Sequence, residues 1–155
     1  MRLTRFTDNA LRALVFLALR PEETPTVGAV ARKMGMSEDH LLKVVQRLSR
    51  LGFVRTVRGR KGGMRLARAA DTIVVGEVIR RTEDNMALVP CFEPAHDGCP
   101  IASACGLAPA LDEALQAFLA TLDRYTVADL IARHGELLEL TGIQRRELAP
   151  SSASM

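Results

Sequence analysis

All three cysteines of the chain lie within one stretch of fifteen residues, at Cys91, Cys99 and Cys105. The spacing Cys-x7-Cys-x5-Cys is wider than the Cys-x2-Cys pairs of structural zinc sites, and it contains no Cys-x-x-Cys redox pair. Thiolates are soft ligands that favour iron–sulfur clusters, zinc or copper(I). Because the stretch is polar and contains several prolines, we interpret it as a loop that binds an iron–sulfur cluster rather than as three inert, buried cysteines.

Three thiolates leave one ligand position unfilled, and several side chains are candidates for it. Glu93, His96 and Asp97 lie in the same stretch, and Asp8 is a distant carboxylate that is also a candidate. Three cysteines and one oxygen ligand favour a [4Fe–4S] over a [2Fe–2S] cluster, and an oxygen ligand on iron is labile, which suits a sensor. One alternative stays open: the same cysteines could sense metal or redox status without any cluster, through zinc or through thiol oxidation.

Charge is distributed unevenly along the chain. Residues 1–70 contain 15 Lys and Arg against 5 Asp and Glu, whereas residues 71–155 contain 6 against 13. The basic half is therefore expected to meet a polyanion such as double-stranded DNA. An iron–sulfur electron carrier or a small enzyme would not need this basic half. We find no Ser-His-Asp arrangement, no phosphate-binding glycine loop before a helix and no convincing catalytic carboxylate pair, so we expect no enzyme.

The first fifty residues predict three helices. Thr7 is expected to cap the first helix, Thr26 the second and Ser37 the third, which ends at Gly52. Two short helices joined by a turn that contains Gly35 are typical of a helix-turn-helix.

The third helix should have one apolar face and one basic face. The apolar positions are Leu41, Val44, Val45, Leu48 and Leu51. A helix of this kind can pack on a core and enter the major groove of DNA. At its N-terminal end, four residues should lie nearest to base edges: Ser37, Glu38, Asp39 and His40. Lys43 would reach bases or phosphates, and Arg47 and Arg50 would contact phosphates.

A β-hairpin should follow this helix. Residues 53–58 and 64–68 have the β-branched, alternating pattern of strands, and the glycine-rich segment 59–63 reverses the chain between them. The hairpin would form the wing of a winged helix. Its cations suit the minor groove or its phosphates: Arg58, Arg60 and Lys61.

The second half of the chain predicts further helices. Residues 73–83 read as a helix, or as a strand that turns into one, and residues 108–124 as a long helix with a broad apolar face. A winged domain this small does not need so long a helix for its own core. We therefore expect it to pack against its equivalent in a second chain, with packing inside one chain as the alternative. Thr126 and Asp129 resemble a capping box that opens a short helix.

These expectations define a mainly α fold, a winged helix-turn-helix with a small β-hairpin wing and a long C-terminal dimerisation helix. The expected divisions are a DNA-binding domain (1–84), a cluster loop (85–107), a dimerisation helix with a short terminal helix (108–140) and a disordered tail (141–155). No apolar run reaches the about 18 residues that a membrane helix needs, and we expect a cytoplasmic protein.

Over about residues 1–134 the sequence resembles the Rrf-type winged-helix regulators, and among them the nitric-oxide-sensitive repressors. The matching stretches are LTRFTDNALRAL, SEDHLLKVVQRLSRLGFV, VRGRKGGMRLA, ALVPC, CPIASAC and LDRYTVADL.

The resemblance implies a homodimeric repressor whose cluster is held by Cys91, Cys99 and Cys105 and which releases its operator when nitric oxide attacks the cluster iron. It also implies that Asp8 matches the position of a carboxylate ligand contributed by the partner chain. Relatives that regulate cluster biogenesis have a histidine three residues after the last cysteine. Here that position is Ala108, so their ligand set does not fit.

Overall fold

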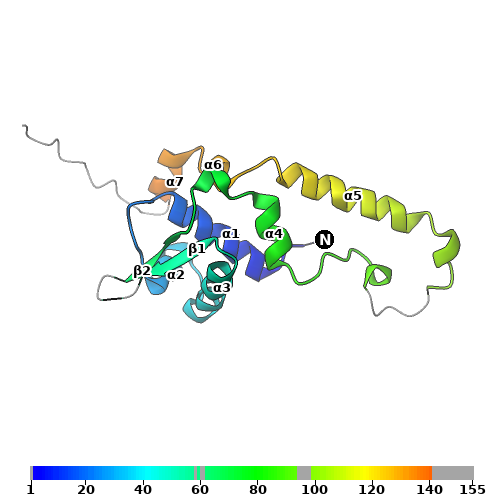
Figure 1. Cartoon of the computed structure of the whole chain (residues 1–155), viewed down its shortest axis with the longest axis horizontal. Helices are drawn as coiled ribbons and strands as arrows, with labels where there is room; N and C mark the ends of the chain where they lie inside the picture. The colour runs from blue at the N-terminus through cyan, green and yellow to red at the C-terminus, as the bar shows by residue number, and fades with distance from the viewer. Residues whose placement is uncertain (1, 58, 60–61, 94–98, 141–155) are drawn as a thin grey trace, which may run out of the picture.

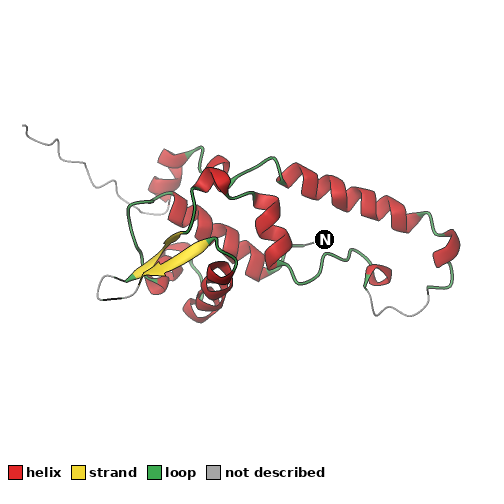
Figure 2. Cartoon of the chain, in the orientation of Figure 1, coloured by secondary structure: helices red, strands yellow, loops and turns green. Residues whose placement is uncertain are grey.

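The chain folds into a body of helices around a small hairpin, from which a long arm extends (Figure 1). The computed structural model describes residues 2–57, 59, 62–93 and 99–140. The helices are α1 (Arg5–Ala18), α2 (Val27–Met34), α3 (Glu38–Arg50), α4 (Val75–Thr82), α5 (Leu107–Leu122), α6 (Val127–Leu130) and α7 (His134–Leu140), and the strands are β1 (Val54–Val57) and β2 (Gly63–Leu66). Figure 2 shows that helices predominate, as the sequence predicts for a mainly α winged helix.

The helix-turn-helix forms largely as its local sequence dictates. The Thr26 hydroxyl accepts a hydrogen bond from the Ala29 amide and caps α2, and the Ser37 hydroxyl caps α3 in the same way. Gly35 ends α2 with φ of 62°, a left-handed conformation that a residue with a Cβ rarely adopts. These three predictions are confirmed.

The cap expected at Thr7 is wrong. The α1 helix begins one turn earlier, where the Thr4 hydroxyl accepts a hydrogen bond from the Thr7 amide. Thr7 itself is fully buried, and its hydroxyl pairs with that of Thr82 at 3.0 Å. A contact across 75 positions of sequence therefore decides the role of Thr7.

The core of the body is built around α1, which contacts α2, α3, α4, α6 and β2. Its fully buried side chains come from α1, α2, α3, β2, α4 and α6 and from the segments just before β1 and α4. They include Leu14, Val30, Leu41, Val44, Leu48, Phe53, Met64, Ile73, Val78 and Val127. Helix α6 begins with the predicted capping box. The Thr126 hydroxyl accepts a hydrogen bond from the Asp129 amide, and the Asp129 carboxylate accepts one from the Thr126 amide. Those hydrogen bonds from Thr126 hold the pKa of Asp129 below its ordinary value.

The wing hairpin pairs Val54 with Leu66 and Val57 with Gly63 in antiparallel register. Its turn end is held close to the segment that precedes α2, because the Met64 amide donates to the Pro25 carbonyl at 2.9 Å. A Cβ on Gly63 would lie only 2.0 Å from the Thr24 carbonyl oxygen, so no larger residue fits there without a shift of the backbone.

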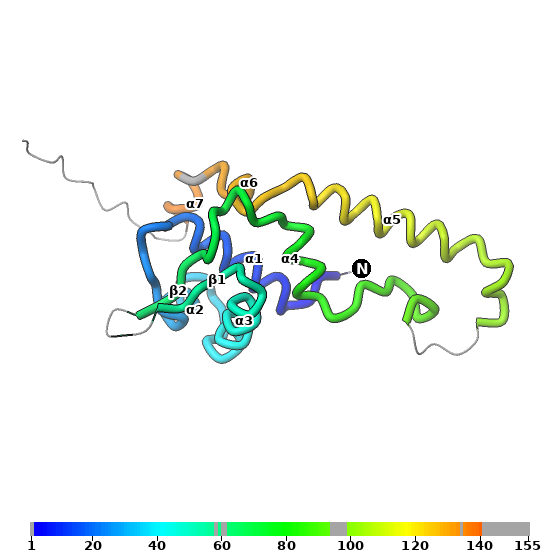
Figure 3. Tube along the Cα trace, viewed as in Figure 1, coloured from blue at the N-terminus to red at the C-terminus, as the bar shows by residue number. Residues whose placement is uncertain are grey.

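The arm consists of the segment after α4, the cysteine loop and α5, which returns toward the body (Figure 3). Only the second half of α5 is well covered: Leu115 and Leu119 pack against Val75 and Ile79 of α4. The first half extends beyond α4, and Leu107 there is 61% exposed. The predicted long helix is confirmed, and within the described residues its packing inside the chain reaches only part of its length.

Candidate nucleic-acid interface and cysteine arm

The exposed face of α3 contains most of the predicted basic stripe, which consists of His40, Lys43, Arg47 and Arg50. Within that stripe, Lys43, Arg47 and Arg50 are exposed, as are the expected base-edge residues Glu38 and Asp39. Two residues that the sequence analysis did not select, Leu42 and Gln46, are exposed between them. The face opposite the buried side chains of α3 is therefore polar with a single large apolar side chain at Leu42.

Two members of the basic stripe, His40 and Arg47, also contact the body. The ring of His40 meets Phe6 of α1 edge-on, with 6.1 Å between ring centroids. The Arg47 guanidinium donates to the backbone carbonyl of Arg81, in the last turn of α4, at 3.3 Å. Arg47 therefore ties α3 to the end of α4, in addition to the phosphate contact predicted for it.

The two remaining residues expected near base edges lie at the start of α3. Ser37 is exposed, and its hydroxyl is engaged as the helix cap. The carboxylate of Glu38 lies against the backbone of Gly28 in the first turn of α2, within 2.8 Å of where a Cβ would stand. Since helix N-termini favour negative charge, Glu38 helps to pack α2 on α3.

The wing cations Arg58, Arg60 and Lys61 lie outside the described residues. At the base of the wing, Arg68 and Arg81 lie over the Phe53 ring at 5.1 and 5.5 Å from its centroid.

Both of these arginines also bond Glu77 of α4, at 2.6 and 2.9 Å. Burial alone would raise the pKa of Glu77, but the hydrogen bonds from Arg68 and Arg81 outweigh it and hold the pKa below its ordinary value. The end of α4 thus connects the wing and, through the carbonyl of Arg81, the helix α3.

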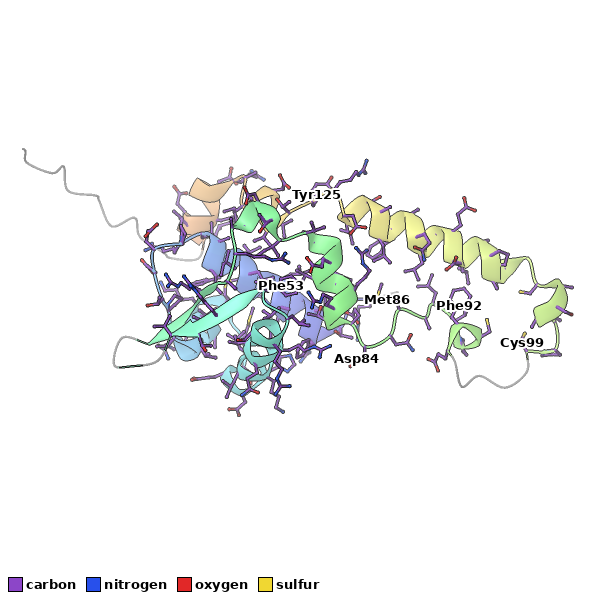
Figure 4. All side chains as sticks on the ribbon, viewed as in Figure 1. Phe53, Asp84, Met86, Phe92, Cys99 and Tyr125 are labelled. Carbon is purple, nitrogen blue, oxygen red and sulfur yellow. The ribbon has the colours of Figure 1, made fainter. Side chains whose placement is uncertain are left out.

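The cysteines lie on the arm, and Figure 4 shows Cys99 at its distal end, near the start of α5. Cys91 belongs to a 3-10 turn, Pro90–Phe92, and Cys105 follows a second one, Ala102–Ala104. All three thiols are free, with Cys91 exposed and the other two half-buried. Among the described residues, no three His, Cys, Asp or Glu side chains gather as they would around a metal.

Of the candidates for a fourth ligand, His96 and Asp97 lie outside the described residues, and Glu93 accepts a hydrogen bond from Asn85 at 3.1 Å. Asp8 lies on α1, in the body, and forms an exposed ion pair with Arg12 at 3.6 Å. It lines an open surface pocket together with other residues at the start of α1: Arg2, Leu3, Thr4, Arg5 and Leu11. The structure of one chain does not bring Asp8 to the cysteines.

Three hydrogen bonds join the start of α1 to the end of α4, where the chain leaves for the arm. The Thr7 and Thr82 hydroxyls pair inside the protein, and the Thr82 hydroxyl also donates to the Val78 carbonyl at 2.8 Å. The Glu83 carboxylate accepts from both the amide and the hydroxyl of Thr4, at 2.8 and 3.0 Å. Sequence reasoning missed this junction because no local pattern announces a bond between residues so far apart.

The fold and site define a winged-helix, DNA-binding transcriptional regulator, and the chain belongs to the Rrf2 family. Residues 3–133 match the model of that family, which is described as an iron-dependent transcriptional regulator. The regulator NsrR of Bacillus subtilis is 45% identical over 141 residues, which cover 90% of this chain and 97% of that protein. NsrR of Geobacillus kaustophilus is 46% identical over the same length, covering 96% of its own chain. Protein aau3 of Rhizobium meliloti is 40% identical over 154 residues, which cover 99% of this chain and 100% of that protein.

Solved structures agree in fold. IscR of T. potens superposes with a TM-score of 0.71 at 24% identity, covering 88% of this chain and 90% of its own. CymR of B. subtilis, titled a global cysteine regulator, gives 0.68 at 25% identity, covering 86% and 98%. These relatives are regulators rather than enzymes, and this chain is a transcriptional regulator of the NsrR type. Within the described residues, none of the helices has both the length and the apolar character needed to cross a membrane.

Proposed function

We propose that the protein is a nitric-oxide-responsive repressor of the cytoplasm, which binds operator DNA as a homodimer while a cluster is held by Cys91, Cys99 and Cys105. The proposal is supported by the matches to NsrR regulators over 90% of the chain. The observation that carries it is that all three cysteines are free thiols on the arm, outside the buried core.

The donor set fits an iron–sulfur cluster in its chemistry. The three thiols are exposed or half-buried and are not consumed by disulfides, so they can become thiolate ligands. When bound, the cluster supplies iron that nitric oxide can attack. A [4Fe–4S] cluster with one oxygen ligand is favoured over [2Fe–2S], because three cysteines leave one iron for a non-sulfur ligand.

The partner chain is proposed to supply the fourth ligand, Asp8. Within one chain, Asp8 lies on α1 in the body while Cys99 lies at the tip of the arm (Figure 4), so a second copy is the natural source of this carboxylate. Its ion pair with Arg12 is exposed and worth less than about 1 kcal/mol, so it does not prevent another role. Arg2 and Arg5, which line the same pocket, would offset the negative charge of thiolates brought there.

Dimerisation is supported by the apolar stripe of α5. Leu111, Leu115 and Leu119 follow Leu107 at successive turns, and α4 covers only the last two of these four. A second α5 could cover the remainder of the stripe. Two recognition helices would then be held at a fixed separation, and successive major grooves on one face of DNA need about 34–36 Å between them.

The path from the arm to the recognition helix is proposed to run through the end of α4. Thr82 and Glu83 bond α1, and the carbonyl of Arg81 accepts from Arg47 of α3. A loop tied to the partner's Asp8 would hold this junction in one position, and a freed loop would let the two recognition helices drift apart.

The test is anaerobic purification of the full chain, followed by iron and sulfide analysis, visible absorbance and operator binding before and after nitric oxide. We expect a coloured protein whose operator affinity falls steeply on exposure. Cys99→Ala should lose the chromophore, and Ser103→Ala, an exposed residue of the same loop, should keep it. A protein that contains neither iron nor sulfide and binds its operator regardless of nitric oxide would contradict the proposal.

The alternative, a repressor that senses metal or redox status through the same cysteines without a cluster, predicts a colourless protein. Its operator binding would respond to peroxide or zinc instead. Asp8→Ala separates the ligand assignment from the sensing itself: we expect an altered visible spectrum, with Asp84→Asn as the exposed control.

A further inference from the structure

The exposed face of α3 contains one apolar residue, Leu42. The DNA-binding role described above does not explain its presence there. Its side chain is 46% exposed, although it belongs to the helix that enters the groove. A single exposed leucine on a protein surface is ordinary and means little by itself. The position of this leucine on the helix is what gives it meaning.

The neighbours of Leu42 mark the part of α3 that is free to meet DNA. One turn before and one turn after it, Asp39 and Gln46 are exposed, and Lys43 is exposed beside it. The buried side chains Leu41, Val44, Val45 and Leu48 occupy the opposite side of the helix. Leu42 therefore lies on the exposed side of α3, next to the row formed by Asp39, Lys43 and Gln46, in the second turn from the N-terminus.

Several other polar side chains of α3 also contact the body. Glu38 lies against Gly28 of α2, and His40 and Arg47 contact α1 and α4. Within the described residues, Leu42 has no such contact in α1 or α4, and it presents an apolar surface beside the exposed polar residues Asp39, Lys43 and Gln46.

The major groove has one apolar group to offer such a surface, the C5-methyl of thymine. We propose that Leu42 is a specificity-determining residue that packs against a thymine methyl in each half-site of the operator. Asp39, Lys43 and Gln46 around it are suited to hydrogen bonds with neighbouring base edges or phosphates. The proposal rests on DNA binding by α3 and not on the cluster or on nitric oxide.

The test uses the full-length protein and a duplex that it selects from a random pool. Each thymine of that duplex is replaced in turn by deoxyuridine, which pairs identically but lacks the methyl group. For the wild type we expect one thymine per half-site at which the change weakens binding about fourfold, the effect of losing one buried methyl-sized group. Fluorescence anisotropy at constant salt measures the ratio.

Variants assign the effect to the side chain. Leu42→Ala should bind the thymine duplex about as weakly as the wild type binds the deoxyuridine duplex, and should show no further loss on substitution. Leu42→Met, which keeps the apolar reach, should retain the preference for thymine. Leu140→Ala removes an exposed leucine from α7, outside α3, and should behave as wild type.

Two results would overturn the inference. One is a wild type indifferent to every deoxyuridine, and the other is a Leu42→Ala variant that keeps the same preference at the same thymine. Because each ratio compares two duplexes on one preparation, loss of nitric-oxide sensing would not change it. Failure of this proposal and failure of the proposed function are therefore distinguishable.

Discussion

The body and the arm differ in how completely each buries its own apolar side chains. In the body, residues such as Leu14 and Phe53 are fully buried by elements of the same chain. On α5, even the best covered residues, Leu115 and Leu119, retain 7% and 8% exposure, and Ile101 and Leu107 toward the tip are 62% and 61% exposed. The body is complete within one chain, whereas the arm presents apolar surface that one chain leaves uncovered.

This difference suggests a division of work. Because the body has its own core, it can hold α3 and the wing in a fixed relative position even when the structure of the arm changes. Because the arm has little core of its own, its structure can depend on a partner chain and on the group that its cysteines bind. The proposed sensing site on the arm and the DNA-binding surface of the body would thereby lie in parts that differ in stability.

The largest effect should come from the body. Leu14→Ala removes a fully buried side chain from the centre of α1, and we expect the free energy of unfolding to fall by about 3 kcal/mol. Urea titration followed by circular dichroism measures it, with the exposed Leu42→Ala as the control that should change by less than about 0.5 kcal/mol. A loss below about 1 kcal/mol for Leu14→Ala would remove the contrast between the two parts.

The next effect should come from the arm and should appear in assembly instead of folding. Leu107→Ala should leave the body folded but raise the dimer dissociation constant by roughly 10- to 100-fold, since each of two copies loses the burial of one leucine. Sedimentation velocity over a dilution series measures it. Gln116→Ala lies off the apolar stripe of the same helix and should leave the constant unchanged. Equal constants for both variants would show that α5 does not carry the interface.

The junction between body and arm should give an intermediate effect. Thr82→Val keeps the shape of the side chain but leaves the buried Thr7 hydroxyl without its 3.0 Å partner, and we expect a loss of about 1–2 kcal/mol in unfolding free energy. The double variant Thr7→Val/Thr82→Val should lose less than the sum of the single variants, because neither hydroxyl then remains unpaired. Strict additivity would mean that the two groups do not interact.

The smallest effect concerns acid sensitivity at the base of the wing. Because the pKa of Glu77 is lowered in the folded protein, its carboxylate stabilises the fold at neutral pH, and this contribution is lost as the pH falls below its ordinary value of 4.5. Glu77→Gln should cost about 0.5–1 kcal/mol at pH 7 and should flatten the decline of stability toward low pH. Glu113→Gln, on the exposed side of α5, is the matched control. An unaltered acid profile for Glu77→Gln would disprove the role of the ion pairs.

Where the chain obeys local chemistry, the sequence was a sufficient guide. The caps at Thr26 and Ser37, the turn at Gly35 and the capping box of Thr126 with Asp129 each involve groups within a few residues of one another. Their geometry depends on backbone conformation that the residues themselves prefer.

Contacts between distant segments were either predicted wrongly from the sequence or not predicted at all. Thr7 has the chemistry of a cap, but its hydroxyl is taken by Thr82. Arg47 belongs to the basic stripe by spacing and is exposed, but its hydrogen bond to the Arg81 carbonyl at the end of α4 could not be predicted from that spacing. The assignment of Cys91, Cys99, Cys105 and Asp8 as one ligand set stays a prediction, because it requires groups that one chain holds apart.

Gly63, at the turn end of the wing, affects the distance between the wing and the recognition helix. With Gly63 pressed against the carbonyls of Thr24 and Pro25, the hairpin is fixed to the segment that leads into α2. Main-chain atoms therefore help to set the span between the wing and the recognition helix, in addition to the contacts of Arg68 and Arg81 at the other end of the hairpin. Relatives could exchange the residues that contact bases and still keep the same distance between the wing and the recognition helix. A single methyl group at position 63 would instead alter that distance, whatever the sequence of the DNA.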